Sequence, residues 1–314
     1  MFRFGPRPDY RRKRVELPDG DFLDLDWYGP EPADFLVLIL HGLEGSSSSH
    51  YIRALSHTLA GLDIPSVVLH QRGCSGVPNR LPRFYHGGET EDLRFVLEWC
   101  RTSLPPRRLY AVGYSLGANI LLKWLGQAGD DSLLAGCVAV SVPFLLDDGA
   151  RRLELGFSRL YQRYLINSMK RSVREKRRRM SYPVEHAAVS RCRTFEQIDT
   201  CLTAPLHGFR DAHDYYCKSS CRQFLGAVRT PTLVIHSRDD PFLTETAIPT
   251  AEELSPAITM ELSRHGGHCG FVAQSPPWRP RYWLDRRVPD FIRSCIGETE
   301  GIAADGLCIS SRTL

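Results

Sequence analysis

The sequence predicts an α/β fold, in which a mostly parallel central sheet has helices on both faces. Short, continuous apolar runs alternate with helix-like segments along much of the chain. Continuous apolar runs are typical of strands buried on both faces, and their alternation with helices is the pattern of an α/β domain. Six runs are expected to form strands: Phe35–Leu40, Ser66–His70, Leu109–Val112, Cys137–Val142, Thr232–His236 and Ile258–Leu262.

Other segments complete the expected α/β domain. Residues 14–28 contain Asp19-Gly20 between two strand-like stretches, which predicts an antiparallel hairpin ahead of the first buried strand. Residues 51–60 and 89–102 have a helical pattern and lie between predicted strands.

The alternation stops between about residues 144 and 228, which are polar and helical in pattern. We expect this segment to be a helical cap inserted over the site. The predicted division is therefore a first part of the core at 1–143, the cap insertion at 144–228, a second part of the core at 229–299 and a flexible tail at 300–314. Apolar residues at three- and four-residue spacing predict one apolar stripe in the cap: Leu153, Phe157, Leu160, Tyr161, Tyr164 and Leu165.

Composition excludes several classes of protein. Hydrophobic residues make up 42% of the 314 residues, enough for a sizeable core, and the net charge of +4 does not demand a nucleic-acid partner. No segment approaches the roughly 20 apolar residues of a membrane span. The first residues contain no apolar stretch typical of a signal peptide, so we expect a cytoplasmic protein whose ten cysteines are reduced thiols.

Basic residues gather at 170–179 and, more briefly, at 11–14. The run at 170–179 is interpreted first as a solvated helix face, and second as a surface that contacts anionic groups such as phospholipid head groups. No nucleic-acid-binding module surrounds it. Cys217 and Cys221 could share a helix face, but without a second pair they do not indicate a metal site.

The most informative motif is Gly113-Tyr114-Ser115-Leu116-Gly117, which directly follows the apolar run 108–112. This G-x-S-x-G pattern at a strand-to-helix junction exposes a serine hydroxyl in a tight turn, where a general base can activate it. The alternative is a small-residue turn that lets a helix pack closely on a strand. Ser115 is the predicted nucleophile.

An acid and a base follow the serine in the expected order, each at the end of a predicted strand. Asp240, directly before a proline, is the preferred acid, and Asp239 is the alternative. His268 lies in a glycine-rich loop that allows a close approach to the serine, and is preferred over His265 as the base.

An oxyanion hole needs two backbone N–H donors. We expect them from Leu116, at the start of a helix, and from Leu43, in the loop after the first buried strand. His41 is expected to shape that loop, with a catalytic role as the weaker alternative. His86 and His50 are interpreted as structural or pocket-lining residues, and Cys269 is not placed as a nucleophile because no strand-turn-helix elbow carries it.

With these residues in hand, the chain resembles the YheT-like branch of the α/β-hydrolase superfamily, which is related to the ABHD1 and ABHD3 type proteins. The resemblance spans roughly residues 15–295 and implies Ser115 as nucleophile, Asp240 as acid and His268 as base. It rests on the motifs Leu40-His41-Gly42-Leu43-Glu44-Gly45-Ser46, Arg72-Gly73-Cys74-Ser75-Gly76, Tyr85-His86-Gly87-Gly88, Gly113-Tyr114-Ser115-Leu116-Gly117-Ala118-Asn119, Asp239-Asp240-Pro241-Phe242 and Gly266-Gly267-His268-Cys269-Gly270-Phe271.

The expected function is hydrolysis of carboxylic esters by a serine hydrolase that requires no metal or organic cofactor. Its expected partner is a small-molecule ester or a lipid-like acyl substrate, with contact to anionic surfaces through 170–179 as a further hypothesis. The alternatives are acyl transfer or lipase activity at the same site, and a non-catalytic membrane-surface protein. Membrane-anchored relatives have an N-terminal hydrophobic segment that this sequence lacks, so the resemblance points to the soluble bacterial branch.

Overall fold

The computed structural model describes residues 7–31, 34–103, 108–273 and 280–297. Its centre is an eight-stranded sheet with the order β1-β2-β4-β3-β5-β6-β7-β8. The pairs β1–β2 and β2–β4 are antiparallel, and every pair from β4 to β8 is parallel. The strands are β1 (Arg11–Glu16), β2 (Phe22–Tyr28), β3 (Phe35–Leu40), β4 (Ser66–Leu69), β5 (Arg108–Tyr114), β6 (Gly136–Val140), β7 (Thr232–Ser237) and β8 (Ile258–Ser263).

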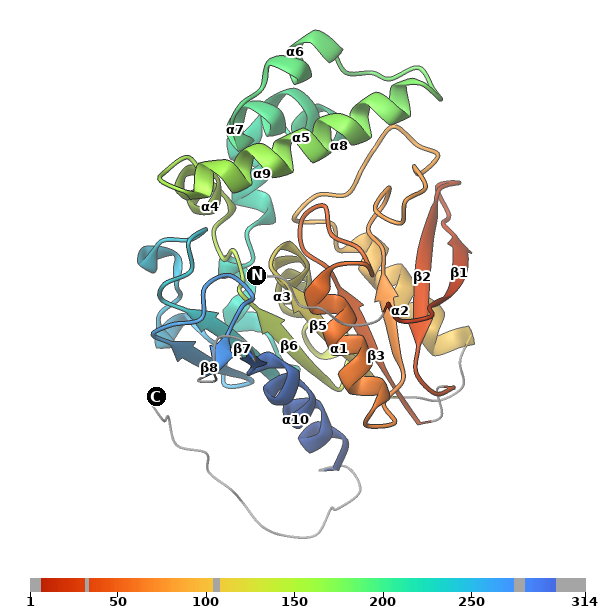
Figure 1. Ribbon diagram of the computed structural model, residues 1–314, viewed down its shortest axis with the longest axis vertical. Coiled ribbons are helices and arrows are strands. Elements are labelled where there is room, and N and C mark those ends of the chain that lie inside the picture. Colours follow the sequence, from red (N-terminus) through yellow and green to blue (C-terminus); the bar gives the residue numbers. More distant parts are fainter. Residues whose placement is uncertain (1–6, 32–33, 104–107, 274–279, 298–314) are drawn as a thin grey trace.

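Helices cover both faces of this sheet, so the predicted fold class is confirmed (Figure 1). Leu36, Leu38 and Leu40 of β3 join one apolar cluster with α2 (Glu91–Ser103) and α3 (Leu116–Ala128). The alternate residues of β3 join a second cluster with α1 (His50–Ala60) and α10 (Leu284–Gly297). Successive side chains of a strand point to opposite faces, so an all-apolar strand supplies both clusters at once.

The motif that begins at Arg72 has a structural task in this sheet. The Arg72 guanidinium is buried, pairs with Asp92 of α2 through two hydrogen bonds of 2.7 Å, and contacts Asp19 and Asp21 next to the hairpin turn. The three carboxylates compensate the buried charge. Arg72 thereby ties the N-terminal hairpin to the helix layer.

Most helices of the segment between β6 and β7 form a separate layer beside one end of the sheet, at the top of Figure 1. These helices share a third apolar cluster, which also includes Tyr85 and Leu116 from the sheet side. The predicted boundaries of the cap, 144–228, stay a prediction. The elements are α4 (Leu146–Arg152), α5 (Ser158–Arg177), α6 (His186–Arg191), α7 (Phe195–Ile198), a π-helical turn (Asp199–Thr203), α8 (Ala204–His207), α9 (Ala212–Ser219) and a 3₁₀ helix (Arg222–Ala227).

The remaining elements are short. They are the 3₁₀ turns Gly129–Asp131, Glu245–Ala247 and Ala251–Glu253, and the two-stranded sheet of β9 (Val272–Ala273) and β10 (Arg281–Tyr282). The predicted tail at 300–314 lies outside the described residues. Among the helices that the structure describes, none combines the length and the apolar character needed to cross a membrane.

The predicted apolar stripe of the cap is wrong in its main part. Leu153 and Leu165 are buried, but Phe157, Leu160 and Tyr164 are 91%, 67% and 66% exposed. The buried face of α5 instead follows a register that includes Ser158, Gln162, Leu165, Ile166, Val173 and Lys176. Residues three or four apart share a helix face, but their spacing alone does not say which face is turned inward.

The basic run also differs from a uniformly solvated face. Arg171, Arg174 and Arg177 are exposed, whereas Lys176 is only 1% exposed. The Lys176 ammonium group donates to the carbonyl oxygens of Leu81, Pro82 and Arg83 at 2.7–3.1 Å and lies 3.9 Å from the centre of the Phe84 ring. Lys176 therefore fastens helix α5 to the loop before α2.

Candidate active site

Ser115 lies in the turn between β5 and α3 with backbone angles of φ 51° and ψ −120°. Few non-glycine residues adopt a positive φ, and those that do often lie at functional sites. The flanking glycines make room for this turn. A Cβ at position 113 would lie 2.6 Å from the Ala118 Cα, and one at position 117 would lie 2.5 Å from the His41 carbonyl oxygen.

The three predicted triad residues lie in one hydrogen-bonded row. The Ser115 hydroxyl is 2.9 Å from His268 Nε2, and His268 Nδ1 is 2.8 Å from Asp240 Oδ2. An ionised carboxylate only accepts hydrogen bonds, so His268 donates from Nδ1, and in the neutral ring Nε2 is then the acceptor that faces the serine. This tautomer is the one that can receive a proton from Ser115.

The two aspartates after β7 have different partners. Asp240 is buried and also accepts a hydrogen bond from the Phe242 N–H at 2.9 Å. Asp239 accepts from the N–H groups of Gly266 and Gly267 at 2.8 and 2.9 Å, and so fixes the start of the loop that carries His268. The structure thus brings Asp240 to His268 and gives Asp239 a role in the shape of the loop.

The two histidines of this loop also differ. His265 is exposed and lies 3.4 Å from Asp239, away from the serine. His268 is half-buried, and the Phe242 ring packs against its imidazole at 4.4 Å between ring centres. Cys269, the next residue, donates from its backbone N–H to the Ser141 hydroxyl at 3.0 Å, which holds the loop against the end of β6.

The environment shifts the pKa values of acid and base in opposite directions. Burial lowers the pKa of His268, but Cys269 and Asp240 raise it more, to about 10. Burial raises the pKa of Asp240, but the His268 ring and the Phe242 amide lower it more, so the net shift is downward. The carboxylate is therefore ionised beside an imidazole that it stabilises in its cationic form.

The predicted oxyanion donors line the same cavity as Ser115. Leu116 is the first residue of α3, where backbone N–H groups and the helix dipole favour negative charge. Leu43 follows Gly42, and a Cβ at position 42 would lie only 3.1 Å from the Ser115 Cβ. His41 is buried behind this loop, with Nδ1 2.7 Å from the Gly42 oxygen and Nε2 accepting from the Gln71 N–H. Its position fits a role in shaping the loop.

A cavity of about 190 Å³ opens at the serine. The sheet side contributes the triad serine and histidine, and the cap contributes most of the remaining wall. The lining is largely apolar or aromatic, which is typical of pockets for small organic ligands. It includes Tyr51, Tyr85, Leu146, Leu153, Tyr161, Leu165, Met169, Phe195, Tyr215, Tyr216, Phe242 and Leu243.

Comparison with known proteins identifies the family of this chain. A family model described as the alpha/beta hydrolase fold matches residues 36–273. The Escherichia coli protein named "Putative esterase YheT" is 41% identical over 285 residues, which cover 89% of this chain and 84% of that protein. The chain belongs to the α/β-hydrolase family. More narrowly, it belongs to the YheT/ABHD branch of esterases and lipases.

Two further relatives extend this branch. The Mus musculus protein named phospholipase ABHD3 is 29% identical, over 93% of this chain and 73% of that protein. The Saccharomyces cerevisiae protein named monoacylglycerol lipase is 31% identical, over 83% of this chain and 59% of that protein. Among solved structures, the Pyrococcus furiosus esterase Pf2001 has a TM-score of 0.58 at 16% identity, covers 93% of this chain and 90% of its own, and shares the fold.

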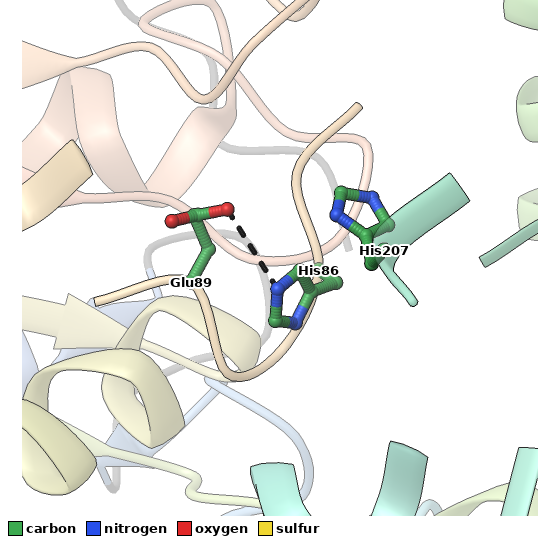
Figure 2. A group of neighbouring side chains, drawn as sticks. All are labelled: His86, Glu89 and His207. Atoms are coloured by element: carbon green, nitrogen blue, oxygen red, sulfur yellow. Dashed lines mark ion pairs between the residues drawn. The ribbon is translucent and has the colours of Figure 1, made fainter. Parts of the chain in front are cut away.

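In this α/β-hydrolase, three side chains of types that often bind metal ions also lie close together beside the cavity. The nitrogen atoms of His86 and His207 and the carboxylate of Glu89 lie within 4.8 Å of one another (Figure 2). Burial lowers the pKa of both histidines, that of His207 to about 4, so both rings are neutral, as a metal ligand requires.

Two of these three groups are nevertheless engaged by the protein itself, whereas His207 Nε2 is buried without a hydrogen-bond partner among the described residues. Arg83 pairs with the Glu89 carboxylate, and the Gly88 N–H donates to His86 Nδ1 at 3.1 Å. The neutral His86 ring then carries its hydrogen on Nε2, 3.7 Å from Glu89. A metal on Nε2 would require the hydrogen on Nδ1, opposite the Gly88 N–H. The hydrogen bonds of His86 and Glu89 thus hold the loop before α2, and the His207 ring of the cap packs against His86 at 4.5 Å between ring centres.

Sequence reasoning missed the residues that the cap adds to the cavity. Asp199 is a buried carboxylate in an otherwise largely apolar wall, and it accepts hydrogen bonds from Thr203 and Tyr216. It follows no strand and belongs to no recognised motif. In Phe195-Glu196-Gln197-Ile198-Asp199, nothing in the sequence distinguishes the buried Asp199 from the exposed Glu196.

Proposed function

We propose that this protein hydrolyses carboxylic esters through an acyl-enzyme intermediate on Ser115, with His268 as the base and Asp240 as the acid that orients it. The row of hydrogen bonds from Asp240 through His268 to Ser115, opening on a largely apolar cavity, carries this proposal. Membership of a branch whose relatives are named esterases and lipases supports it.

In the first half of the reaction, Ser115 Oγ attacks the ester carbonyl carbon while its proton moves to His268 Nε2. Asp240 stabilises the imidazolium that forms and keeps the ring in the required tautomer. The carbonyl oxygen becomes an oxyanion, which accepts hydrogen bonds from the N–H groups of Leu43 and Leu116; each such donor contributes about 3 kcal/mol to the transition state. The C–O bond then breaks, and His268 gives its proton to the leaving alcohol.

In the second half, a water molecule takes the place of the alcohol. His268 accepts a proton from the water as its oxygen attacks the acyl carbon, and the second oxyanion uses the same two donors. Collapse of this intermediate releases the carboxylic acid, and the proton returns from His268 to Ser115 Oγ. This cycle needs no group beyond the side chains and backbone named here.

The test combines labelling and turnover. A fluorophosphonate should attach to Ser115, as read by mass spectrometry of the labelled peptide. Ser115→Ala should lower kcat for short p-nitrophenyl esters by roughly 10⁶-fold, with an unchanged circular dichroism spectrum. Turnover that persists in this variant would refute the proposal. Reaction in the presence of a competing alcohol separates hydrolysis from acyl transfer, because transfer yields a new ester as well as free acid.

A specific surface favours lipid-like substrates as a second proposal. The exposed apolar patch of Phe157, Leu160 and Tyr164 lies on α5 and just before it, and Tyr161, between them in sequence, lines the cavity. Exposed arginines continue along the same helix at 171, 174 and 177. Aromatic and basic residues on one exposed helix are typical of proteins that lie on anionic bilayers. We propose that this helix contacts such a bilayer and presents the cavity to it.

Vesicle sedimentation tests this contact on the intact protein. Binding to vesicles that contain phosphatidylglycerol should fall about tenfold when Arg171 and Arg174 are replaced by glutamine, and should weaken with salt. Vesicles of phosphatidylcholine alone are the control. Equal binding to both kinds of vesicle would contradict the charge-based part of the proposal. The cytoplasmic location expected from the sequence stays a prediction.

A further inference from the structure

Asp199 stands out among the residues that line the cavity. It is only 6% exposed, and it lies on the cap wall of the same cavity that holds Ser115 and His268. The described residues that line the cavity include no Lys or Arg, and no described Lys or Arg forms an ion pair with Asp199. Its negative charge is therefore not compensated by a cation of the described chain.

The hydrogen bonds of Asp199 leave acceptor capacity unused. Its Oδ1 accepts from the Thr203 hydroxyl at 2.6 Å, and its Oδ2 accepts from the Tyr216 hydroxyl at 2.7 Å. A carboxylate offers about four acceptor positions, so about two remain. Burial raises the pKa of Asp199 to about 6, because an apolar wall disfavours the charged form of the carboxyl group.

The backbone around Asp199 is also unusual. Residues 199–203 form a π-helical turn, closed by the hydrogen bond from the Ala204 N–H to the Asp199 carbonyl. Single π-helical turns are rare and occur frequently at functional sites. Phe195, one helical turn earlier, and Tyr215, beside Tyr216, line the same cavity. The carboxylate is thus held among aromatic rings on the wall of the cavity.

We propose that Asp199 selects the substrate: its carboxylate accepts a hydrogen bond from a hydroxyl or ammonium group carried by the ester. This inference rests on the proposed function, since the ester must reach Ser115 in the same cavity. Hydroxyl and ammonium groups both offer an O–H or N–H donor for the unused acceptor positions of Asp199. The aromatic rings nearby would also favour a cation.

A purely structural role explains the arrangement less well. A neutral acceptor could hold the hydroxyl groups of Thr203 and Tyr216, whereas an ionised carboxylate in an apolar wall costs free energy unless a donor or cation compensates it. A site built to hydrogen-bond a substrate group rejects analogues that lack the group, because its own polar atom is then left unpaired. Asp199 would act in this way.

Two series of esters test the proposal. In one, p-nitrophenyl hexanoate is compared with its ω-hydroxy and ω-amino derivatives. In the other, the same three end groups are placed on the alcohol of an acetate ester. In at least one series the wild type should prefer a donor-bearing ester by roughly 10- to 100-fold in kcat/KM, the range expected of a hydrogen bond to a charged group. Comparison of the hydroxy ester with the amino ester shows whether Asp199 prefers a hydroxyl or an ammonium donor.

The variant Asp199→Asn keeps the shape and removes the charge. It should abolish the preference, so that the three esters of a series react with similar kcat/KM. Glu196→Gln, an exposed neighbour in α7, is the matched control and should keep the preference. Equal loss on all three esters together with a lower Tm would show a structural role only, and would overturn the proposal, as would a wild type without preference in either series.

A binding measurement separates this proposal from the proposed function. In Ser115→Ala, calorimetry should show tighter binding of a donor-bearing product acid or alcohol than of the plain one, and Asp199→Asn in the same background should remove the difference. This result is expected even if turnover of the esters is undetectable. Equal affinity for all the products would refute the role of Asp199 while leaving the assignment of Ser115 unaffected.

Discussion

The two walls of the cavity differ in how the chain specifies them. On the sheet side, Ser115, Asp240 and His268 each follow a parallel strand, and the carboxyl ends of parallel strands meet at one edge of the sheet. On the cap side, residues such as Asp199 and Tyr216 come from helices and turns whose positions depend on packing. Strand order thus brings the residues of the proposed triad to one edge of the sheet, whereas contacts within the cap determine which substrates the cavity can select.

The largest difference expected within the sheet side is between its two aspartates. Asp240→Asn should lower kcat by about 10⁴-fold, because an amide beside His268 favours the wrong tautomer of the imidazole. Asp239→Asn should cost no more than about tenfold, because its oxygen can still accept from the loop glycines. Steady-state kinetics on a short ester measure both variants. Equal losses would show that the two carboxylates act together.

The pH profile probes the base. Only the unprotonated His268 can accept the serine proton, so kcat/KM should rise about tenfold per pH unit below the raised pKa and level off near pH 10. Cys269→Ala removes one cause of the raised pKa of His268 and should move the rising part of the pH profile to lower pH. At each pH, the rate measured with Ser115→Ala is subtracted as the background. A limb at the ordinary histidine value of 6.5 would contradict the upward shift.

The cap side is expected to show its largest effect in stability. Lys176→Met leaves three carbonyl oxygens without their donor in a buried contact, so the free energy of unfolding should fall by about 2–4 kcal/mol. Arg171→Met, an exposed position on the same helix, is the control and should change it by less than about 0.5 kcal/mol. Urea denaturation measures both. Equal changes would show that the buried contact contributes little.

The smallest expected effect concerns the exposed apolar patch. Replacing Phe157, Leu160 and Tyr164 one at a time by serine should change the free energy of unfolding by less than about 0.5 kcal/mol each, because these side chains are mostly exposed. Vesicle binding should weaken in the same variants. A loss of more than 2 kcal/mol in any of them would show that the patch packs within the protein.

Much of the sheet side was predictable from local patterns. Phe35–Leu40 and Ile258–Leu262 are predicted as buried strands, and the structure has β3 and β8 at these places with at most one residue of difference. The burial is confirmed for β3 but wrong for β8, which lies at the edge of the sheet and is buried only at Ile258. The G-x-S-x-G motif indicated the turn that the backbone adopts at Ser115. The choice of Asp240 over Asp239 depended on a single proline, and the two carboxylates are told apart structurally by their partners at His268 and the loop glycines.

The buried face of helix α5 in the cap could not be predicted from local patterns, for a physical reason. Spacing predicted a stripe through Phe157 and Leu160, but the buried register of α5 runs through Gln162, Ile166 and Lys176. A polar residue can occupy the inward face when partners on another segment satisfy it, as the carbonyl groups at 81–83 satisfy Lys176. No local pattern encodes such partners, because they lie about 95 residues away.

By itself, the sequence determined a parallel sheet with a serine, an acid and a histidine at the ends of its strands, because apolar runs and glycine turns act over a few residues. Only the tertiary structure decided which carboxylate meets the imidazole, which face of α5 is buried, and that Asp199 enters the cavity. These outcomes depend on hydrogen bonds and packing between distant segments, which exist only once the chain has folded.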